Sequence, residues 1–142
     1  MEEVKNSITE YIPQRPPMVM IDELIQANDA SGSTSFTILP ENIFADGDAF
    51  SEPGMLENIA QTAAAMVGYQ CKINKTPVPL GFIAAVKNWK LLGIPRVNSS
   101  IETTIKVVNS VMDVSIVEGT ITQGNQLLCS CEMRILIQKN KG

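Results

Sequence analysis

The sequence predicts an α+β domain in which an antiparallel sheet of about five or six strands wraps around one long central helix. The segment 53–69 carries apolar residues in nearly every direction around a helical axis. The second half of the chain alternates apolar and polar residues in short runs divided by turn residues. A helix that is apolar all round has to be enclosed by protein, and strands are the elements left to enclose it. The 142 residues suffice for one core, so we expect a single domain over 1–142.

The first half of the chain predicts a short helix and two strands. Apolar residues at helical spacing indicate an amphipathic helix over 3–11, which the prolines that follow bring to an end. Strands are expected over 18–25 and 33–39, with a polar, glycine-containing turn between them. Residues 40–51 then form a loop that leads into the long helix.

The long helix is expected to begin at Pro53, because proline suits the first helical turn, with Ser51 or Glu52 near the cap. Its apolar run ends near Tyr69 and is too short to cross a membrane. The alanines in its middle would let a neighbouring backbone approach closely. The surrounding sheet therefore has to bury the whole circumference of the helix.

The second half of the chain predicts a meander of antiparallel strands. In chain order, these strands are expected over 80–89, 100–107, 111–122 and 127–138. Asn109 and Ser110 fit a tight turn between the second and third strands, and a Gln-Gly-Asn turn precedes the last. In the third strand we expect Met112, Val114 and Ile116 to share one face.

The last strand alternates cleanly between inward apolar and outward polar residues. The side chains expected to face the helix are Cys129, Cys131, Met133, Ile135 and Ile137. A sheet that curls around a buried helix in this way is the hotdog fold. One edge of such a sheet stays unpaired, and because exposed edges are normally paired or covered, we expect a dimer formed through that edge.

The composition excludes several classes of function. The chain has 11 basic and 15 acidic side chains and a formal net charge of -4, whereas nucleic-acid-binding proteins usually present a basic surface. It contains no histidine, which excludes histidine-based catalytic triads and histidine metal sites. Acid–base chemistry must then come from Asp, Glu, Lys, Tyr, Cys or bound water. We expect no nucleic-acid partner, no metal and no cofactor.

The start of the chain and its cysteines indicate a soluble, cytoplasmic protein without membrane association. The first residues are acidic and lack the apolar stretch that is typical of a signal peptide. Cys71, Cys129 and Cys131 have no metal-ligand spacing, and we expect them to be small buried hydrophobic residues in a reducing compartment.

The first half of the central helix carries polar residues that burial does not require. Glu57 with Gln61, and Asn58 with Thr62, are pairs four residues apart and therefore form one stripe. An ionised carboxylate in an otherwise buried helix is costly unless it is paired or used chemically, so Glu57 is a candidate general acid. Alternatively, Glu57 lies at an exposed helix start and only complements the helix dipole.

The loop ahead of the helix contains Asp46, Gly47 and Asp48, and Gly54 opens the helix. Backbone N–H groups at a helix start can polarise a carbonyl oxygen, as in an oxyanion hole. A plain acidic turn followed by a helix cap is the alternative.

A second group of charges surrounds Trp89, which lies beside Lys87 and Lys90 and near Arg96. Together with Arg15, these side chains would form a basic rim able to meet a phosphate or an acidic carrier protein. Ordinary solvated charges at strand ends are the alternative.

Several segments resemble the beta-hydroxyacyl-(acyl carrier protein) dehydratases. Residues 11–23, which read Tyr-Ile-Pro-Gln-Arg and end at an Asp-Glu pair, resemble the opening of that family, Leu-Pro-His-Arg followed by apolar residues and an Asp. Residues 56–61, Leu-Glu-Asn-Ile-Ala-Gln, resemble its central-helix motif Glu-Ala-Leu-Ala-Gln. Residues 86–97 are similar to its third-strand region, and 118–133 to its last hairpin. The similarity covers nearly the whole chain and implies the hotdog fold.

Within that family, the chain is most similar to the dehydratases linked to aryl polyene or flexirubin-type pigment synthesis. The shared features are the short loop ahead of the helix and the strand start Gly81-Phe82.

The resemblance implies a mechanism. In the family, a loop histidine removes the α-proton of a 3-hydroxyacyl thioester, and a helix carboxylate from the partner subunit protonates the departing hydroxyl. Backbone amides at the helix start hold the thioester oxygen. The carboxylate corresponds to Glu57. The residues expected to contact the substrate are Gln14, Gly54, Asn58, Gln61 and Phe82.

The family's histidine has no counterpart in this chain. Its Gly-His-Phe motif corresponds to Gly47-Asp48 with Phe50 just beyond, and the histidine of Pro-His-Arg is replaced by Gln14. Asp48 is therefore the candidate base, although a solvated aspartate is a weaker base than imidazole at neutral pH. A water oriented by Glu57 or Gln61 is the other option.

Three functions remain open. The first is a dehydratase with an altered base that acts on acyl carrier protein or coenzyme A thioesters in fatty acid or polyene-type synthesis. The second is a non-catalytic subunit that pairs with a related hotdog chain and shapes a shared acyl tunnel. The third is an acyl thioesterase that uses Glu57 and water. A homodimer and a heterodimer are both compatible with the sequence.

Overall fold

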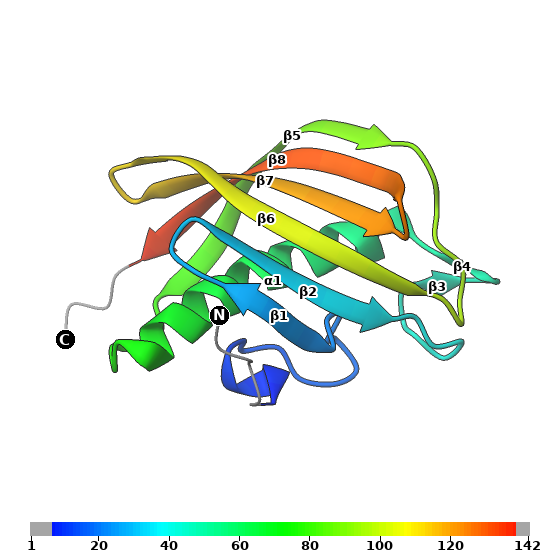
Figure 1. Cartoon of the computed structure of the whole chain (residues 1–142), viewed down its shortest axis with the longest axis horizontal. Helices are drawn as coiled ribbons and strands as arrows, with labels where there is room; N and C mark the ends of the chain where they lie inside the picture. Colours follow the sequence, from blue (N-terminus) through cyan, green and yellow to red (C-terminus); the bar gives the residue numbers. More distant parts are fainter. Residues whose placement is uncertain (1–6, 139–142) are drawn as a thin grey trace.

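The computed structural model describes residues 7–138 and contains one long helix packed on a six-stranded antiparallel sheet (Figure 1). The main elements are β1 (Glu23–Ala27), β2 (Ser31–Thr37), α1 (Glu52–Ile73), β5 (Leu80–Leu91), β6 (Ser100–Val111), β7 (Val114–Gln123) and β8 (Gln126–Gln138). The short ones are the 3-10 turn η1 (Ile8–Glu10) and the hairpin strands β3 (Ala45–Asp46) and β4 (Ala49–Phe50). The sheet order is β1-β2-β6-β7-β8-β5, with all neighbours antiparallel. This confirms the predicted α+β hotdog architecture.

The core lies between α1 and the inner face of the sheet. The inner face carries Ile101, Thr103 and Ile105 of β6, Val117, Gly119 and Ile121 of β7, and Cys129, Cys131 and Met133 of β8. As expected, Ile135 and Ile137 share that face of β8, where they line a groove described below. From the helix, Met55, Ile59, Ala63 and Met66 are buried against this face. The predicted inward alternation of β8 is thus confirmed.

The helix is not enclosed on every side, contrary to the expectation from its composition. The sheet covers one side, and the segment 11–21 covers another through buried Tyr11, Ile12 and Ile21. A third face of α1 stays half-buried: Leu56, Glu57, Ala60, Ala64 and Val67. The reason is that β5 bonds only to β8 at the sheet edge and does not close over the helix.

The strand expected over 18–25 begins only at Glu23, the start of β1. The reason is that side chains of α1 hydrogen-bond the backbone of Met18 and Met20. Gln61 Nε2 donates to the Met18 carbonyl over 2.7 Å, and Gln61 Oε1 accepts from the Met20 N–H over 2.7 Å. Asn58 Nδ2 donates to the Met20 carbonyl, also over 2.7 Å. These groups are therefore not free to pair with a neighbouring strand. Of the helix expected over 3–11, the described part forms the turn η1, and residues 3–6 lie outside the described residues.

The turn between β6 and β7 lies at Met112 and Asp113, not at Asn109 and Ser110 as predicted. A bulge between Val107 and Asn109 keeps the ladder going, so that Asn109 and Ser110 still pair with β7. The hairpin is consequently longer than expected.

The face of β7 that meets the helix is the opposite of the predicted one. Met112 is in the turn and 96% exposed, and Val114 and Ile116 are only half-buried, whereas Val117 and Ile121 are buried. The residues of β7 that face the helix are Val117, Gly119 and Ile121. Because the middle one is a glycine, the alternation of apolar residues on this face is not evident in the sequence.

In the part of the chain that the structure describes, no helix combines the length and apolar character needed to cross a bilayer.

Candidate functional site

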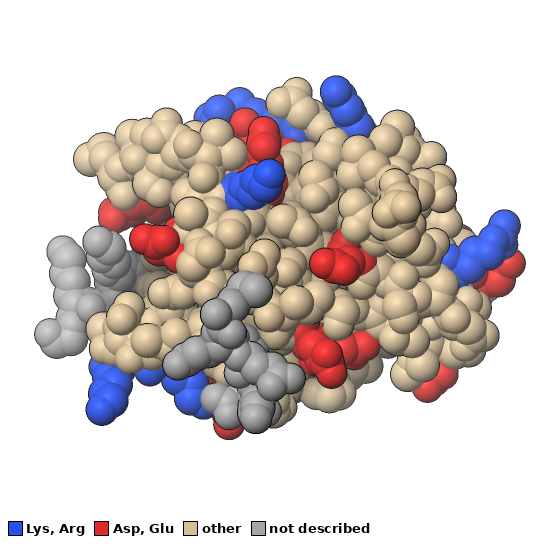
Figure 2. Space-filling model, viewed as in Figure 1, with Lys and Arg blue, Asp and Glu red and all other residues tan. Residues whose placement is uncertain are grey.

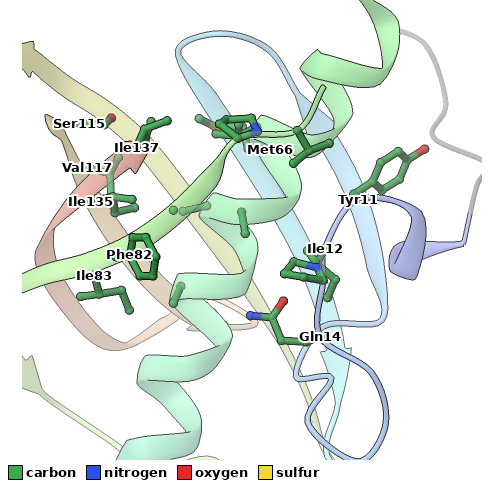
Figure 3. Close-up of a pocket in the computed structure, with 18 of the residues that line it drawn as sticks. Tyr11, Ile12, Gln14, Met66, Phe82, Ile83, Ser115, Val117, Ile135 and Ile137 are labelled. Carbon is green, nitrogen blue, oxygen red and sulfur yellow. The ribbon is translucent and has the colours of Figure 1, made fainter. Parts of the chain in front are cut away.

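A groove of about 1350 Å³ runs along the half-buried face of α1 (Figure 3). Its floor is formed by small and apolar side chains of the helix, including Ala60, Ala64 and Val67. One wall comes from β5 and the adjoining parts of β7 and β8, and the other from residues 9–15. Figure 3 shows Phe82 and Ile83 on one side of the groove and Ile12 and Gln14 on the other. Drug-sized ligands occupy pockets of about 300–1,000 Å³, so this groove has room for an extended acyl chain.

Glu57 is half-buried on the same face of the helix and lines this groove. The first turns of α1 place it there, because Met55 and Ile59 on either side are buried against the sheet. Its Oε2 accepts a hydrogen bond of 2.9 Å from Gln61 Nε2, one helical turn further along. Within residues 7–138, no hydrogen bond or ion pair engages its Oε1. The structure therefore presents one carboxylate oxygen that is held and one that is available.

Asn58 and Gln61 are on a buried face of the helix and do not line the groove. Asn58 Oδ1 accepts a hydrogen bond from the Thr103 hydroxyl of β6, and its Nδ2 bonds the Met20 carbonyl. Thr62, the other member of the polar stripe, donates to the Asn58 carbonyl over 2.8 Å. Both amides are engaged by protein groups through their oxygen and their nitrogen, and a substrate contact by Asn58 or Gln61 stays a prediction.

Gln14 and Phe82, which were expected to contact the substrate, do line the groove together with Glu57. Figure 3 shows the Gln14 side chain between Ile12 and the helix. Its Oε1 is buried and has no hydrogen-bond partner within the described residues. This orphaned acceptor is suited to a donor group on a bound molecule.

Asp48 lies away from this groove, on the turn between β3 and β4. Its carboxylate forms an ion pair with Arg96, and both side chains are more than two-thirds exposed, at 72% and 71%. Its carbonyl also accepts a hydrogen bond of 2.8 Å from the Val97 N–H. Within one chain, the candidate base and the candidate acid are thus not brought together, and a role for Asp48 in a partner's groove stays a prediction.

Gly54 is fixed by packing at the helix start. A Cβ at this position would lie 2.6 Å from the Phe50 ring and 2.7 Å from Phe44. The two phenylalanines anchor the loop to the core, and a side chain at position 54 would collide with them.

Several groups of the predicted basic rim are engaged within the chain, and the rim itself stays a prediction. On the face drawn in Figure 2, the Lys and Arg side chains are dispersed around the molecule. Arg96 is paired with Asp48, and Trp89 Nε1 donates to Glu52 Oε1 over 3.0 Å. Among the residues that line the groove, the cation is Arg15, whose Nη1 donates to the carbonyls of Ile12 and Gln14 over 2.8 and 2.7 Å.

The sequence interpretation missed Tyr11 and Ser115 as groove residues. Tyr11 is 2% exposed, and its hydroxyl has no hydrogen-bond partner within the described residues. Its helical spacing from Ile8 suggested only a core contact, and Ser115 falls in a strand whose inner face was assigned wrongly. Neither position carried a local signal for a site.

Residues 6–141 match the family model for ApeP-like proteins, which is described as ApeP dehydratase. No curated protein matches the chain. The dehydratase heterocomplex ApeI:P from Xenorhabdus doucetiae contains a similar fold at 17% identity, with a TM-score of 0.82 over 97% of this chain and 94% of that one.

Two further structures share the fold. They are the PaaI protein from the phenylacetic acid degradation operon of E. coli (9% identity, TM-score 0.67, 80% and 81% covered) and a hypothetical thioesterase with coenzyme A from Streptococcus pneumoniae (8%, 0.67, 84% and 88%). At such identities these likenesses concern the fold alone. The match to the family model extends over nearly the whole sequence, and the chain therefore belongs to the ApeP-like dehydratase family.

Proposed function

We propose that this chain is a subunit of a dehydratase that acts on 3-hydroxyacyl thioesters of an acyl carrier protein or coenzyme A, in fatty acid or polyene-type synthesis. The observation that carries the proposal is the position of Glu57 among the residues that line the groove of about 1350 Å³. The acyl chain lies along the alanine floor of α1, and the C3 hydroxyl meets the available Oε1.

The reaction is a β-elimination. A base takes the proton from C2, the electron pair of that C–H bond forms the C2–C3 double bond, and the C3–O bond breaks. Glu57 transfers its proton to the departing hydroxyl, which leaves as water. Because the chain has no histidine, the base is Asp48 of a second subunit, a bound water or a group of a different partner chain.

A second hotdog subunit completes the site. The 12-residue strand β5 lies at the sheet edge, and its exposed apolar side chains include Phe82 and Ile83, both 49% exposed, and Val86, 40% exposed. Long apolar edge strands are normally paired or covered. Pairing through β5 would extend the sheet and close the groove beside Glu57. The presence of a similar chain in the ApeI:P dehydratase heterocomplex favours a related, non-identical partner.

A non-catalytic subunit is the second candidate function. The absence of histidine and the pairing of Asp48 with Arg96 favour it, because neither leaves a strong base in this chain. Such a subunit would shape a shared acyl groove, and a histidine-bearing homologue would supply the chemistry.

Turnover assays separate these functions. The purified chain, alone and mixed with a histidine-bearing hotdog dehydratase subunit, is given a 3-hydroxyacyl thioester on an acyl carrier protein. Mass spectrometry measures the enoyl product, and a thiol reagent measures hydrolysis. Glu57→Gln is compared with Glu118→Gln, a matched change on an exposed strand position.

We expect enoyl product that falls by about 10²-fold or more in Glu57→Gln and is unchanged in Glu118→Gln. Product that needs the partner subunit and is indifferent to Glu57→Gln would identify a non-catalytic subunit. Release of free thiol without enoyl product would identify a thioesterase.

A further inference from the structure

We propose that Gln61 is a positioning residue that holds Glu57 so that the transferable proton resides on Oε1, the oxygen available to the groove. This role rests on the proposed dehydratase function. It differs from the substrate contact that the family motif implies for Gln61, because Gln61 is 0% exposed and does not line the groove.

The Gln61 amide is fully used, and its orientation is therefore fixed. Nε2 donates one hydrogen to the Met18 carbonyl over 2.7 Å and the other to Glu57 Oε2 over 2.9 Å, while Oε1 accepts from the Met20 N–H over 2.7 Å. The reversed amide would direct its NH₂ group at the Met20 N–H and its oxygen at two other oxygens. Only one of the two amide orientations satisfies all three partners.

This fixed donor decides where Glu57 carries its proton. An amide NH₂ donates and does not accept, so a proton on Glu57 Oε2 would find no acceptor in Gln61. A proton on Oε1 leaves the Gln61 hydrogen bond intact. Protonated Glu57 thus donates from Oε1, and after proton transfer the carboxylate keeps its bond from Gln61.

The same amide connects the helical floor of the groove to one of its walls. By binding the backbone of Met18 and Met20, Gln61 anchors the segment that carries Gln14 and Arg15 to α1. One buried side chain therefore sets the distance between the acid and the wall against which a substrate would lie. A misplacement of about 1 Å in such a site costs up to about 10²-fold in rate.

The test compares Gln61→Glu and Gln61→Met with Thr62→Val, in the assembly that shows Glu57-dependent turnover. Gln61→Glu keeps the shape and the acceptor for the Met20 N–H but replaces the donor to Glu57 by an oxygen. Gln61→Met removes all three hydrogen bonds. Thr62→Val removes buried hydrogen bonds of the next helix position without touching Glu57.

Both Gln61 variants are expected to lower kcat by about 10- to 100-fold with little change in KM, and Thr62→Val to lower the unfolding temperature while kcat is retained. Added to Glu57→Gln, Gln61→Met should cause a much smaller loss of kcat than it causes in the wild type, because the part of its effect that runs through the carboxyl group is then already lost. An equal further loss in that background, or a change confined to KM, would overturn the positioning role.

A spectroscopic measurement is independent of activity. The side-chain NH₂ protons of Gln61 are followed by NMR in the wild type and in Glu57→Ala, where we expect one of the two resonances to shift strongly. Turnover that Gln61 variants leave unchanged would refute the positioning role and leave the proposed function intact. The NH₂ shift without any Glu57-dependent turnover would instead refute the proposed function, and with it the catalytic use of the contact.

Discussion

Gly119 of β7 lies directly beneath Ile59 of α1, and a Cβ at Gly119 would come within 2.4 Å of Ile59 Cγ2. A residue with a side chain at this position would collide with the helix. The glycine therefore allows α1 to pack closely against β7.

Gly119→Ala is expected to destabilise the fold by about 1–3 kcal/mol, because the branched Ile59 side chain or the helix has to shift to accommodate the methyl group. Urea unfolding measures the effect. Gly81→Ala is the matched control, since a Cβ there would lie 3.6 Å from Ile135, an ordinary contact distance. Equal stability of the two variants would show that the helix adjusts without cost.

Cys129 and Cys131 are expected to be inert toward thiol reagents at neutral pH in the folded protein. Burial raises the pKa of the Cys129 thiol to about 12 and that of Cys131 to about 11. Counting with a chromogenic thiol reagent should therefore detect Cys71 in the native protein and all three cysteines in denaturant. Rapid native labelling of Cys129 or Cys131 would contradict the burial of this strand.

The same pKa shifts make stability fall at alkaline pH. Above about pH 8.5 the unfolded chain releases its thiol protons while the folded chain retains them until about pH 11–12, so the free energy of unfolding decreases as the pH rises through this window. Denaturation curves recorded from pH 8 to pH 11 test the slope. Cys129→Ala should flatten it, whereas Cys71→Ser should leave it unchanged.

Asp48→Asn tests the candidate base. The Asp48–Arg96 ion pair is exposed, so its loss should change the unfolding temperature little. If Asp48 serves the groove of a second subunit, Asp48→Asn lowers kcat by about 10²-fold or more, and Arg96→Gln, which frees the same carboxylate, does not. An unchanged kcat in Asp48→Asn would leave water or a different chain as the base.

Val86→Lys is expected to disrupt subunit association, because it places a charge on the edge strand β5 that we propose as the interface. Sedimentation velocity measures the oligomer formed by the chain, alone and with a hotdog partner. Ile25→Lys is a suitable control, since Ile25 is 43% exposed on β1 at the opposite edge of the sheet. Loss of association in Ile25→Lys but not in Val86→Lys would show that the subunits meet through β1 and not through β5.

The sequence by itself determined the elements with a strong local pattern. The apolar run after Pro53 specified α1, and the strict alternation from Cys129 to Met133 specified the inner face of β8. Glu57 could be singled out because a carboxylate is unusual in such a helix, and the structure places it in the groove.

Only the tertiary structure decided which polar groups meet. Met20 and Gln61 are 41 residues apart in the chain. Their hydrogen bond holds residues 18–20 against the helix, in a segment where the sequence predicts a strand. The groove likewise depends on β5 staying apart from α1, and the position of the hairpin turn at Met112 depends on a bulge within β6. Local periodicity reports which face of an element is apolar, but a hydrogen bond between distant segments depends on the position of both in the fold, and no pattern within either segment encodes that position.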